Sequence, residues 1–334
     1  METGWSLLRT RMSDFNRQMD RLVAPGRRPV VRALYLFDVG AALLLYGASV
    51  SDYFACEFYK KRHCERRRFI TIRRANRMFR FLNDPQDAVV VRDKSRFHKL
   101  FADLTGREYL DTVECSREEF VTFARRHKAF IVKPIAGGFG LGVRRIDTTA
   151  ETDLGALYDE LKASGMLAEE IIRQHDEMAS FHPDSVNAVR VTTVLKDGRT
   201  QVVTAAAKFG NAHSITDNFS MGGILAAIEP ETGIVVSSGV DKDGRRYVRH
   251  PVTNRQILGF TIPQWDGVVA LVGRAAIRLP RVRYVGWDVA LSKESGPVLV
   301  EGNDMGTLRG QQFADQVGKR DLYDSVLKGM KKLS

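Results

Sequence analysis

Residues 129–142 read AFIVKPIAGGFGLG, a short apolar strand that ends in Lys133 and Pro134 and continues into a glycine-rich turn. Such a turn lets backbone N–H groups approach phosphate oxygens, and a lysine at a strand end supplies a fixed positive charge. The spacing matches neither a G-x-x-x-x-G-K-[ST] loop nor a G-x-G-x-x-G turn that opens a helix. A second strand is expected at 143–146, so the pattern predicts a β-hairpin flap. A mobile hairpin without a ligand remains the alternative.

Strands and helices are predicted to alternate on both sides of this flap. Apolar runs bounded by turn residues predict strands at 88–91, 129–133, 143–146, 166–172, 189–195, 201–208, 224–228, 233–240, 284–291 and 297–301. Periodic apolar positions predict helices at 93–104, 120–126, 154–163 and 265–279. Asp197-Gly198 is typical of a two-residue hairpin turn between two of these strands. The sequence therefore predicts an α+β fold.

Oxygen donors gather near the C-terminus. Asp288 lies within the apolar strand YVGWDVAL, and Glu301 and Asn303 end the next strand, VLVEGND. Two adjacent antiparallel strands can bring these side chains to one place, and carboxylates with an amide oxygen suit Mg²⁺. A carboxylate in an apolar strand is costly unless it has a partner, so Asp288 is the most informative of the three. A hydrogen-bonded structural aspartate is the alternative.

Three further polar stretches carry weaker signals. The run Glu169-Glu170-Ile171-Ile172 closes an apolar strand, where a hinge backbone could offer one donor and one acceptor to a nucleotide base. Asn187 and Arg190 stand three residues apart at the start of strand VRVTTV, and an arginine there can neutralise a phosphoryl group. The polar turn Asp217-Asn218-Phe219-Ser220-Met221-Gly222-Gly223 leads into another strand. Each stretch taken alone also fits a structural role.

The charge is concentrated at one end of the chain. The 334 residues carry 51 Lys and Arg against 40 Asp and Glu, a net of +11, and residues 1–80 hold 17 against 7 of these. The remaining residues are nearly neutral, which excludes a chain-wide nucleic-acid surface and favours a local basic patch facing phosphate groups. With 44% hydrophobic residues, the chain is not disordered. Cys56, Cys64 and Cys115 have no metal-ligand spacing, which favours reduced thiols and a cytoplasmic location.

The basic N-terminal region is predicted to be mostly helical. A stripe of apolar residues three and four apart predicts a first amphipathic helix, with Trp5, Leu8, Met12, Phe15, Met19 and Leu22 on one face. Residues 33–50 form an apolar segment barely long enough to span a membrane and interrupted by Asp38, so we expect a buried or surface-lying helix instead. Residues 51–83 predict a second basic helical stretch, which Asp84-Pro85 ends. Docking of the first helix on its own protein, an anionic membrane or a partner all stay open.

The order of these motifs resembles the ATP-grasp superfamily from about Lys94 to Asn303. Within it, the sequence is most similar to the sugar-transfer associated ATP-grasp proteins. The stretches that carry the resemblance are SDYF, EFY, DKSRFHKLF, FIVKP, EEII, HPDSVNAVRVTT, TDNFSMGG, VGWDVAL and VLVEGN. The E-x-N motif together with FIVKP is the strong part of the match.

This resemblance implies ATP held between two α+β subdomains, together with Mg²⁺. It implies that the phosphates and base are bound by Lys94, Lys133, Gly137, Gly138, Gly140, Glu169, Glu170, Ile172 and Asn187, with Glu169 at the adenine amino group. The implied metal ligands are Asp288, Glu301 and Asn303, and the implied catalytic residues are Arg190, Lys208 and Asn218. Many relatives have an arginine shortly after the E-x-N asparagine, whereas Asp304 and Met305 follow it here. That difference leaves the acceptor pocket open.

The resemblance implies an ATP-dependent carboxylate–amine (or –thiol) ligase that works through an acylphosphate, acting on small and perhaps sugar-derived substrates in polysaccharide or sugar-conjugate assembly. A small-molecule kinase and a non-catalytic, membrane-associated nucleotide-binding scaffold are the alternatives. The expected regions are a basic helical part (1–83), a subdomain with the glycine flap (84–168) and a C-terminal subdomain with the metal site (169–334). We expect no nucleic-acid partner. Peripheral contact with the inner face of the membrane and oligomerisation stay open.

Overall fold

The chain divides into two compact units, each described here by itself. The computed structural model describes residues 13, 15–20, 22, 28–137, 140–149, 153–211, 217–306, 308 and 310–333. Unit 1 comprises Met1–Phe81 with Thr307–Met330, and unit 2 comprises Leu82–Gly306 with Lys331–Ser334. All of the predicted site residues lie within unit 2.

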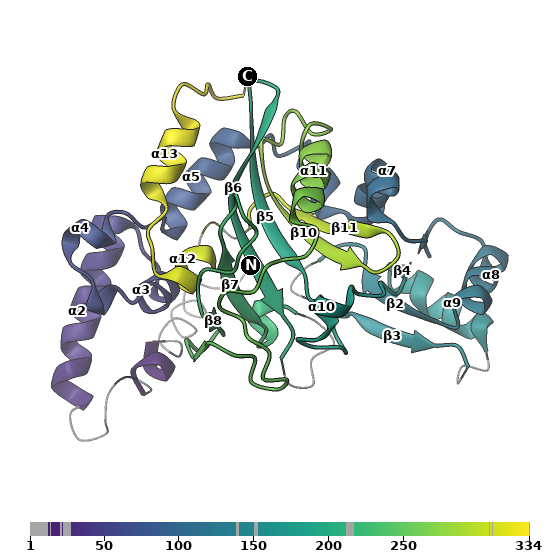
Figure 1. Ribbon diagram of the computed structural model, residues 1–334, viewed down its shortest axis with the longest axis horizontal. Coiled ribbons are helices and arrows are strands. Elements are labelled where there is room, and N and C mark those ends of the chain that lie inside the picture. Colours follow the sequence, from purple (N-terminus) through teal and green to yellow (C-terminus); the bar gives the residue numbers. More distant parts are fainter. Residues whose placement is uncertain are drawn as a thin grey trace. The chain divides into compact units, whose positions relative to one another are not determined.

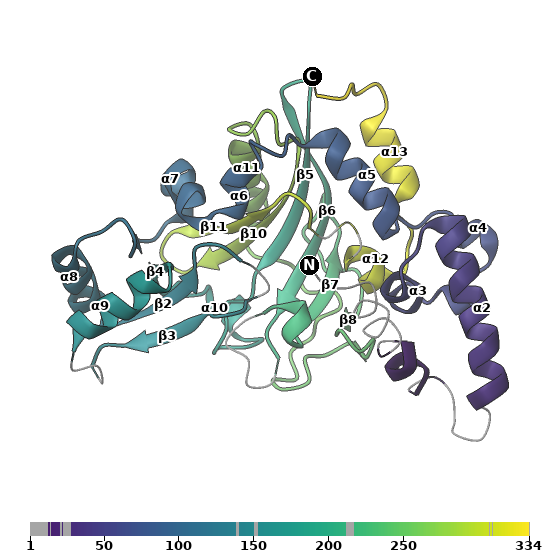
Figure 2. The same ribbon diagram turned by 180° about the vertical axis from the view of Figure 1, so that it is seen from behind.

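The first sheet of unit 2 is four-stranded and antiparallel, in the order β1-β4-β2-β3. Its strands are β1 (Tyr109–Asp111), β2 (Ala129–Pro134), β3 (Arg144–Asp147) and β4 (Met166–Glu170). Figures 1 and 2 place helices α8 (Arg117–His127) and α9 (Leu154–Ala163) beside this sheet. Alternate residues of β2, Phe130 and Val132, are fully buried with Phe120 and Leu161 of these helices. Period-two burial therefore gives the strand its inner face.

The second sheet of unit 2 has seven strands in the order β11-β10-β5-β6-β7-β8-β9, all antiparallel to their neighbours. Its strands are β5 (Val189–Lys196), β6 (Arg199–Phe209), β7 (Ile224–Ile228), β8 (Gly239–Val240), β9 (Arg246–Tyr247), β10 (Tyr284–Ser292) and β11 (Gly296–Asn303). Helices α6 (Val89–Arg92), α7 (Lys94–Thr105) and α11 (Trp265–Ala276) pack on it around one apolar core. The short helices α10 (Asp176–Ala179) and η3 (Phe219–Met221) lie in its connections.

The predicted α+β fold is confirmed, with two predicted strands corrected. Of the strand predicted at 233–240, only Gly239–Val240 forms a strand, β8, and Ile234 and Val235 make isolated bridges. Residues 88–91, predicted as a strand, form the helical turn α6. The Asp84 side chain accepts hydrogen bonds from the backbone N–H groups of Gln86 and Asp87, which starts a turn rather than a strand. Val91 is buried against β11, so its apolar character reflects packing of one turn of helix. A four-residue apolar run cannot by itself distinguish these two outcomes.

Helix α7 is bounded by clear local signals. Asp93 caps its N-terminus, with a side-chain oxygen that accepts from the backbone N–H of Arg96 at 3.0 Å. Gly106 ends it with a left-handed φ of 59°, a conformation that glycine adopts without strain. A Cβ at Gly106 would also overlap Cγ1 of Val298 on β11. The end of α7 is thus fixed closely against the seven-stranded sheet.

Unit 1 is helical in its described part. Its elements are α2 (Arg28–Tyr46), α3 (Val50–Ala55), η2 (Phe58–Lys60), α4 (His63–Arg66), α5 (Ile72–Leu82), α12 (Gly310–Asp315) and α13 (Arg320–Leu327). The sequence predicted one C-terminal subdomain over 169–334, but residues 307–330 pack with the N-terminal helices instead. The buried Gln312 side chain explains this difference, because it both accepts from the backbone N–H of Ile70 and donates to its carbonyl.

The predicted first helix lies partly outside the described residues. Trp5, Leu8 and Met12 are not described, whereas Phe15 and Met19 are buried in the core of unit 1. The apolar segment expected at 33–50 forms α2, which begins earlier than expected. Its window Pro29–Tyr46 is long and apolar enough to cross a membrane, and only 6% of that window is buried within the protein. A buried helix, one of the two expectations, is therefore not found.

We predict that Gly106→Ala lowers the free energy of unfolding by about 3 kcal/mol. Gly165→Ala, the matched control, should cost about 1 kcal/mol. Both glycines follow a helix with nearly equal φ, 59° and 62°, but a Cβ at Gly165 would meet no atom within 4 Å. The left-handed conformation costs about 1–2 kcal/mol at either position, and overlap with Val298 adds to it only at Gly106. Urea unfolding measures both values, and equal losses would contradict the close approach.

Candidate functional site

Strand register brings three predicted side chains to one place on the seven-stranded sheet. Asp288 on β10 lies directly opposite Arg190 on β5 and opposite Glu301 on β11. Arg190 donates from Nε and Nη2 to the two carboxylate oxygens of Asp288, and its Nη2 lies 3.7 Å from Oε1 of Glu301. Both Asp288 and Arg190 are buried. Burial would raise the pKa of Asp288, but Arg190 and Lys208 outweigh it and hold that pKa well below its usual range.

Lys208 on β6 extends this cluster. Its ammonium lies 3.1 Å from Asp288 and 3.2 Å from Asp217, which begins the polar turn before η3. Burial would lower the pKa of Lys208, but these two carboxylates raise it, so the side chain stays charged. Desolvation instead raises the pKa of Asp217, and Lys208 offsets only part of this rise. Two cations thus sit among three carboxylates, those of Asp217, Asp288 and Glu301.

The donor set of this cluster fits a magnesium ion shared with phosphates. Asn303 donates from Nδ2 to Oε1 of Glu301 at 3.1 Å. The pKa of Glu301 is raised by burial and then by the neighbouring Asp288, which means that its negative charge is incompletely balanced by the protein. Within the described residues, no group of three or more His, Cys, Asp and Glu is arranged to hold a metal alone. Mg²⁺ commonly takes one or two carboxylates and completes its shell with phosphates and water.

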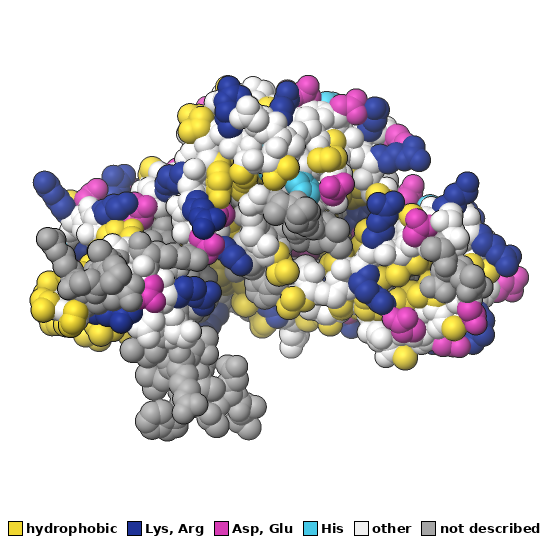
Figure 3. All heavy atoms as spheres, turned by 90° about the horizontal axis from the view of Figure 1, so that it is seen from below, with side chains coloured by type: hydrophobic (Ala, Val, Ile, Leu, Met, Phe, Trp, Pro, Cys, Tyr) yellow, Lys and Arg dark blue, Asp and Glu magenta, His cyan; other side chains and the backbone are white. Residues whose placement is uncertain are grey.

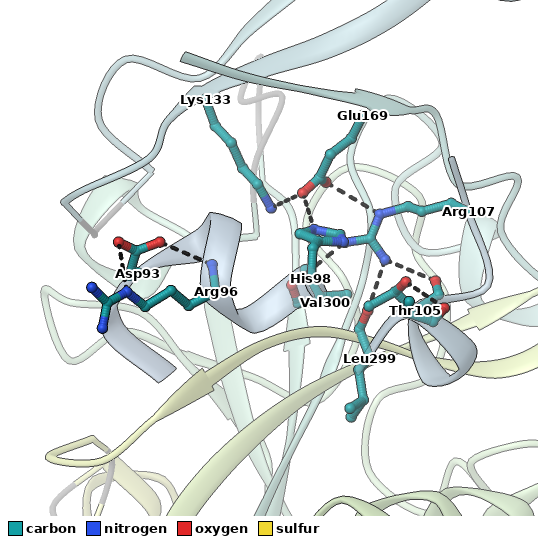
Figure 4. Close-up of polar contacts among 10 residues, drawn as sticks. Asp93, Arg96, His98, Thr105, Arg107, Lys133, Glu169, Leu299 and Val300 are labelled. Atoms are coloured by element: carbon teal, nitrogen blue, oxygen red, sulfur yellow. Dashed lines mark hydrogen bonds and ion pairs between the residues drawn. The ribbon is translucent and has the colours of Figure 1, made fainter. Parts of the chain in front are cut away.

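A second charged cluster lies on the four-stranded sheet (Figure 4). Glu169 on β4 is buried, and its carboxylate forms an ion pair with Lys133 on β2, lies 3.2 Å from Nε of Arg107 and 2.5 Å from Nε2 of His98. Burial would raise the pKa of Glu169, but Arg107, Lys133 and His98 together hold it well below its usual range. Arg107 also donates to the carbonyl of Leu299 on β11 at 2.7 Å, which ties this cluster to the other sheet.

The glycine flap contacts the first turn of α7. Lys94 Nζ donates to the carbonyl of Gly137 at 2.8 Å, and its backbone N–H donates to the carbonyl of Ile135. Gly137 and Gly140 have φ angles of 119° and 71°, so both use conformations that side chains disfavour. Gly138 lies outside the described residues. The lysine at the start of α7 and the flap that follows β2 therefore face each other.

The two clusters belong to one site. Helix α7, which carries Lys94, packs on β11, where Val91 and Phe97 lie against Gly302 between Glu301 and Asn303. Burial lowers the pKa of Lys94, Lys133 lowers it further, and Glu301 and Glu169 partly restore it. Lys94 therefore interacts electrostatically with charged residues of both sheets. Lys94 is half-buried, and its lowered pKa is consistent with a position suited to an anion.

Five predicted residues have partners or positions that bear on their predicted roles. Asn187 is a correction: its buried Nδ2 donates to Met178 and His182 carbonyls and to Gln174, and its Oδ1 accepts from Gly210, so no group is left for a cofactor. The carboxylate of Glu169, predicted at the adenine amino group, is already held by three side chains. The Glu170 N–H donates to the Glu108 carbonyl, which removes it as a nucleotide donor. Asn218 and Ile172 are half-buried beside the two clusters, in the turn before η3 and after β4.

Sequence reasoning missed several members of the site. His98 and Arg107 hold Glu169. His98 stands in the stretch DKSRFHKLF, Arg107 stands in none of the stretches that carry the resemblance, and the roles of both depend on packing between α7, β1 and β4. Asp217 was quoted only as the start of a polar turn, and its neighbour Asn218 was chosen instead. Asp304, noted for replacing an expected arginine, is buried and accepts from Arg92 at 2.5 Å. Asp217 and His98 have a usable signal, because each stands inside a stretch that carries the family resemblance.

The sequence of this chain matches a known protein family. The family model described as sugar-transfer associated ATP-grasp matches residues 73–328, which confirms the resemblance inferred from the motifs. No curated protein is significantly similar to this chain.

Several solved structures are similar to this chain at low sequence identity. The ATP-grasp ligase PsnB, complexed with a phosphomimetic variant of its minimal precursor, Mg and ADP, is 20% identical with a TM-score of 0.46, over 74% of this chain and 61% of that one. D-alanyl-alanine synthetase A from Vibrio cholerae O1 biovar eltor str. N16961 is 11% identical with a TM-score of 0.46, over 73% of this chain and 65% of that one. L-amino acid ligase from Bacillus licheniformis is 15% identical with a TM-score of 0.43, over 73% of this chain and 50% of that one. The chain spans less than two thirds of each of these proteins, and their ligands remain properties of those proteins.

We predict that Glu169→Gln lowers the free energy of unfolding by about 3 kcal/mol at neutral pH, because it leaves buried cations without their carboxylate. The pKa of Glu169 is depressed below its ordinary 4.5 in the folded state. The stabilisation by its charge is therefore complete above that value and is lost as the pH falls toward the depressed pKa. Urea unfolding at several pH values should show the difference between wild type and variant shrinking in acid.

Glu170→Gln is the matched control for this prediction. Its side chain stands next along β4 and accepts from the backbone N–H of Glu108 at 3.1 Å. We expect a loss below about 1 kcal/mol. A Glu169→Gln penalty that stays constant between about pH 7 and about pH 3 would rule out the buried ion pairs as its source.

Proposed function

This chain belongs to the sugar-transfer associated ATP-grasp family, and from that premise we propose that it is an ATP-dependent ligase that joins a carboxylate to an amine through an acylphosphate. The observation that carries the proposal is the joining of two charged clusters in one compact unit. Lys94 and Lys133 lie next to the glycine flap, and Asp288 and Glu301 lie on the seven-stranded sheet against which α7 packs. This is the charge pattern that a magnesium–nucleotide complex requires.

Binding of the nucleotide would use the flap side of the site. Lys94 and Lys133 are the cations next to the glycine turn, and backbone N–H groups of that turn can approach phosphate oxygens because Gly137 and Gly140 carry no Cβ. When bound, Mg²⁺ would be held by Glu301 and Asn303, and by Asp288 in competition with Arg190 and Lys208, which already donate to both of its oxygens. The ion would neutralise charge on the phosphates. Lys133 already has a partner in Glu169, so phosphate would compete with that carboxylate for its ammonium.

The first chemical step transfers the γ-phosphoryl group. A carboxylate oxygen of the acid attacks the γ-phosphorus, the bond to the bridging oxygen breaks, and ADP leaves with the electron pair. Arg190 and Lys208 remain charged at neutral pH, because the neighbouring carboxylates raise both pKa values. Held in place by Asp288, they can stabilise the charge that develops on the phosphoryl oxygens without moving far. Catalysis in this scheme is positioning and electrostatics, with no covalent role for a side chain.

The second step forms the amide bond. The amine attacks the acyl carbon, phosphate leaves with the electron pair of the broken C–O bond, and the nitrogen loses one proton. The family's association with sugar transfer supports testing sugar-derived acids and amines as substrates. The carboxylate of Asp217 stands in the polar turn beside Lys208, and burial raises its pKa, so it is a candidate to receive that proton.

A phosphate-release screen tests the proposed reaction. Uronic acids and amino acids are supplied singly and in pairs with amines, in the presence of ATP and Mg²⁺. A ligase releases phosphate only when acid and amine are both present, and mass spectrometry finds the amide. A stable phosphorylated product with a single acceptor would instead identify a kinase. Nucleotide binding with no turnover across all mixtures would favour a scaffold and overturn the ligase proposal.

We predict that Glu301→Gln and Asp288→Asn each lower kcat by about two to three orders of magnitude at saturating Mg²⁺, as loss of one preorganised electrostatic partner typically does. The matched control is Glu294→Gln, in the turn between the same two strands, whose side chain is 62% exposed. That control should keep wild-type turnover. Steady-state kinetics with the substrate pair found in the screen measure all three variants. Near-wild-type kcat in both site variants would exclude their metal role.

A further inference from the structure

Helix α2 of unit 1 exposes an unusually apolar face. Val30, Leu34, Phe37, Leu44 and Leu45 are 72%, 64%, 80%, 79% and 68% exposed, and Leu36 and Leu43 are each 43% exposed. Figure 3 shows apolar side chains gathered at the left-hand edge, where α2 lies, with Lys and Arg side chains beside them. Single exposed leucines are ordinary, but a contiguous apolar patch marks a surface that binds protein or lipid.

The two charged residues between Pro29 and Tyr46 are both engaged by unit 1. Asp38 accepts two hydrogen bonds from Arg66, at 2.6 and 2.8 Å, and one from the hydroxyl of Tyr53 at 2.6 Å. Arg32 lies 3.0 Å from Asp20. The acidic residue that interrupts the apolar segment in the sequence is therefore turned toward the protein. The outward face of α2 is left without its charge.

The opposite face of α2 packs on the core of unit 1. Ala42 is fully buried there, and Val31, Tyr35, Val39 and Tyr46 pack against the same core. The helix is thus attached along its length, with one apolar face turned inward and one turned outward. An amphipathic helix of a water-exposed protein would carry polar residues on that outward face.

The segments before and after α2 meet each other, which bears on how it could contact a bilayer. Phe15 precedes the helix and Phe54 follows it, and their ring centroids are 5.9 Å apart. Asp20, also before the helix, pairs with Arg32 inside it. A helix that crosses a bilayer separates its two flanks by about 30 Å of hydrocarbon. The folded unit 1 is therefore compatible with α2 lying in the plane of the membrane surface, and a spanning helix would have to break these contacts.

The charge of the surrounding chain identifies the kind of membrane. Residues 1–80 hold 17 Lys and Arg against 7 Asp and Glu, a net of +10. At the C-terminal end of α2, Tyr46 hydrogen-bonds His63 at 2.5 Å, and the exposed residues Lys60, Arg62 and Arg67 lie in the same short stretch. Basic side chains next to an apolar helix face are the combination that binds anionic lipid headgroups.

We propose that the outward face of α2 inserts into the headgroup region of an anionic lipid bilayer, with unit 1 lying on the membrane surface. Phe37 and Leu44 are the principal inserted side chains, and the basic residues at the helix ends contact lipid phosphates. This inference is independent of the ligase proposal, because none of the residues it uses belongs to the site in unit 2.

A vesicle flotation assay with the full chain tests the proposal. We expect binding to vesicles of phosphatidylcholine with about one third phosphatidylglycerol to exceed binding to phosphatidylcholine alone by about tenfold. The double variant Phe37→Ser/Leu44→Ser should bind the anionic vesicles at least about tenfold more weakly than the wild type. Raising the salt from about 0.1 M to about 1 M, which shortens the screening length from about 10 to about 3 Å, should release most of the wild type.

Ile277→Ser is the matched control, since Ile277 is an exposed aliphatic residue of unit 2, 55% exposed. It should bind vesicles like the wild type. Circular dichroism should give all variants the same folded signal, because surface substitutions cost little stability. Turnover of ATP without vesicles should also be unchanged.

Four outcomes overturn the proposal. Equal binding to the two vesicle types would show that lipid charge plays no part. No binding to either type would show that α2 does not bind membranes. Attachment that resists high salt and alkaline carbonate indicates a spanning helix. An oligomer in solution that Phe37→Ser/Leu44→Ser converts to monomers, without vesicle binding, assigns the face to a second copy of this chain.

Discussion

The site depends on one buried ion pair between neighbouring strands. Arg190 and Asp288 stand opposite each other on β5 and β10, away from solvent, and neither charge would be tolerated there alone. Leaving one member of such a pair unpartnered costs about 3–5 kcal/mol, and a register shift of one residue would turn both side chains to the other face of the sheet. The pair therefore fixes the position of Glu301, the next residue across the register.

The same requirement for partnered charge joins the two sheets of unit 2. Glu169 is satisfied by the cations Lys133 and Arg107 and by the imidazole of His98 on α7. Arg107 also donates to backbone carbonyls of β11 at Leu299 and Val300 (Figure 4). The carboxylate nearest the flap is thus connected through a single guanidinium to the strand that carries the candidate metal ligands. A phosphate that drew Lys133 away from Glu169 would change the electrostatics of this whole connection.

The sequence predicted the residues whose chemistry is local and missed those whose role depends on packing. Lys133 could be predicted because it ends a strand that continues into glycines. Asp288 could be predicted because a charge inside an apolar strand is costly unless it has a partner. In the sequence, Asn187 looks like a residue that binds a ligand. In the folded chain its side-chain amide forms hydrogen bonds with neighbouring loops, and the sequence does not show these partners. Arg107 carries no signal, since its two partners come from distant segments. Val91 was misread because a single apolar turn has no measurable period.

Asp38 extends this reasoning to unit 1. On hydropathy alone, an acidic residue in the middle of an apolar segment argues against contact with a bilayer, because it would be desolvated at a cost of about 2.5–3.5 kcal/mol. That argument assumes that the carboxylate faces lipid. In the folded unit it faces Arg66 and Tyr53, and burial, opposed by these partners, leaves the pKa of Asp38 below its usual range. The direction in which a charge points, which requires its partners to be known, therefore decides whether an apolar helix can meet lipid.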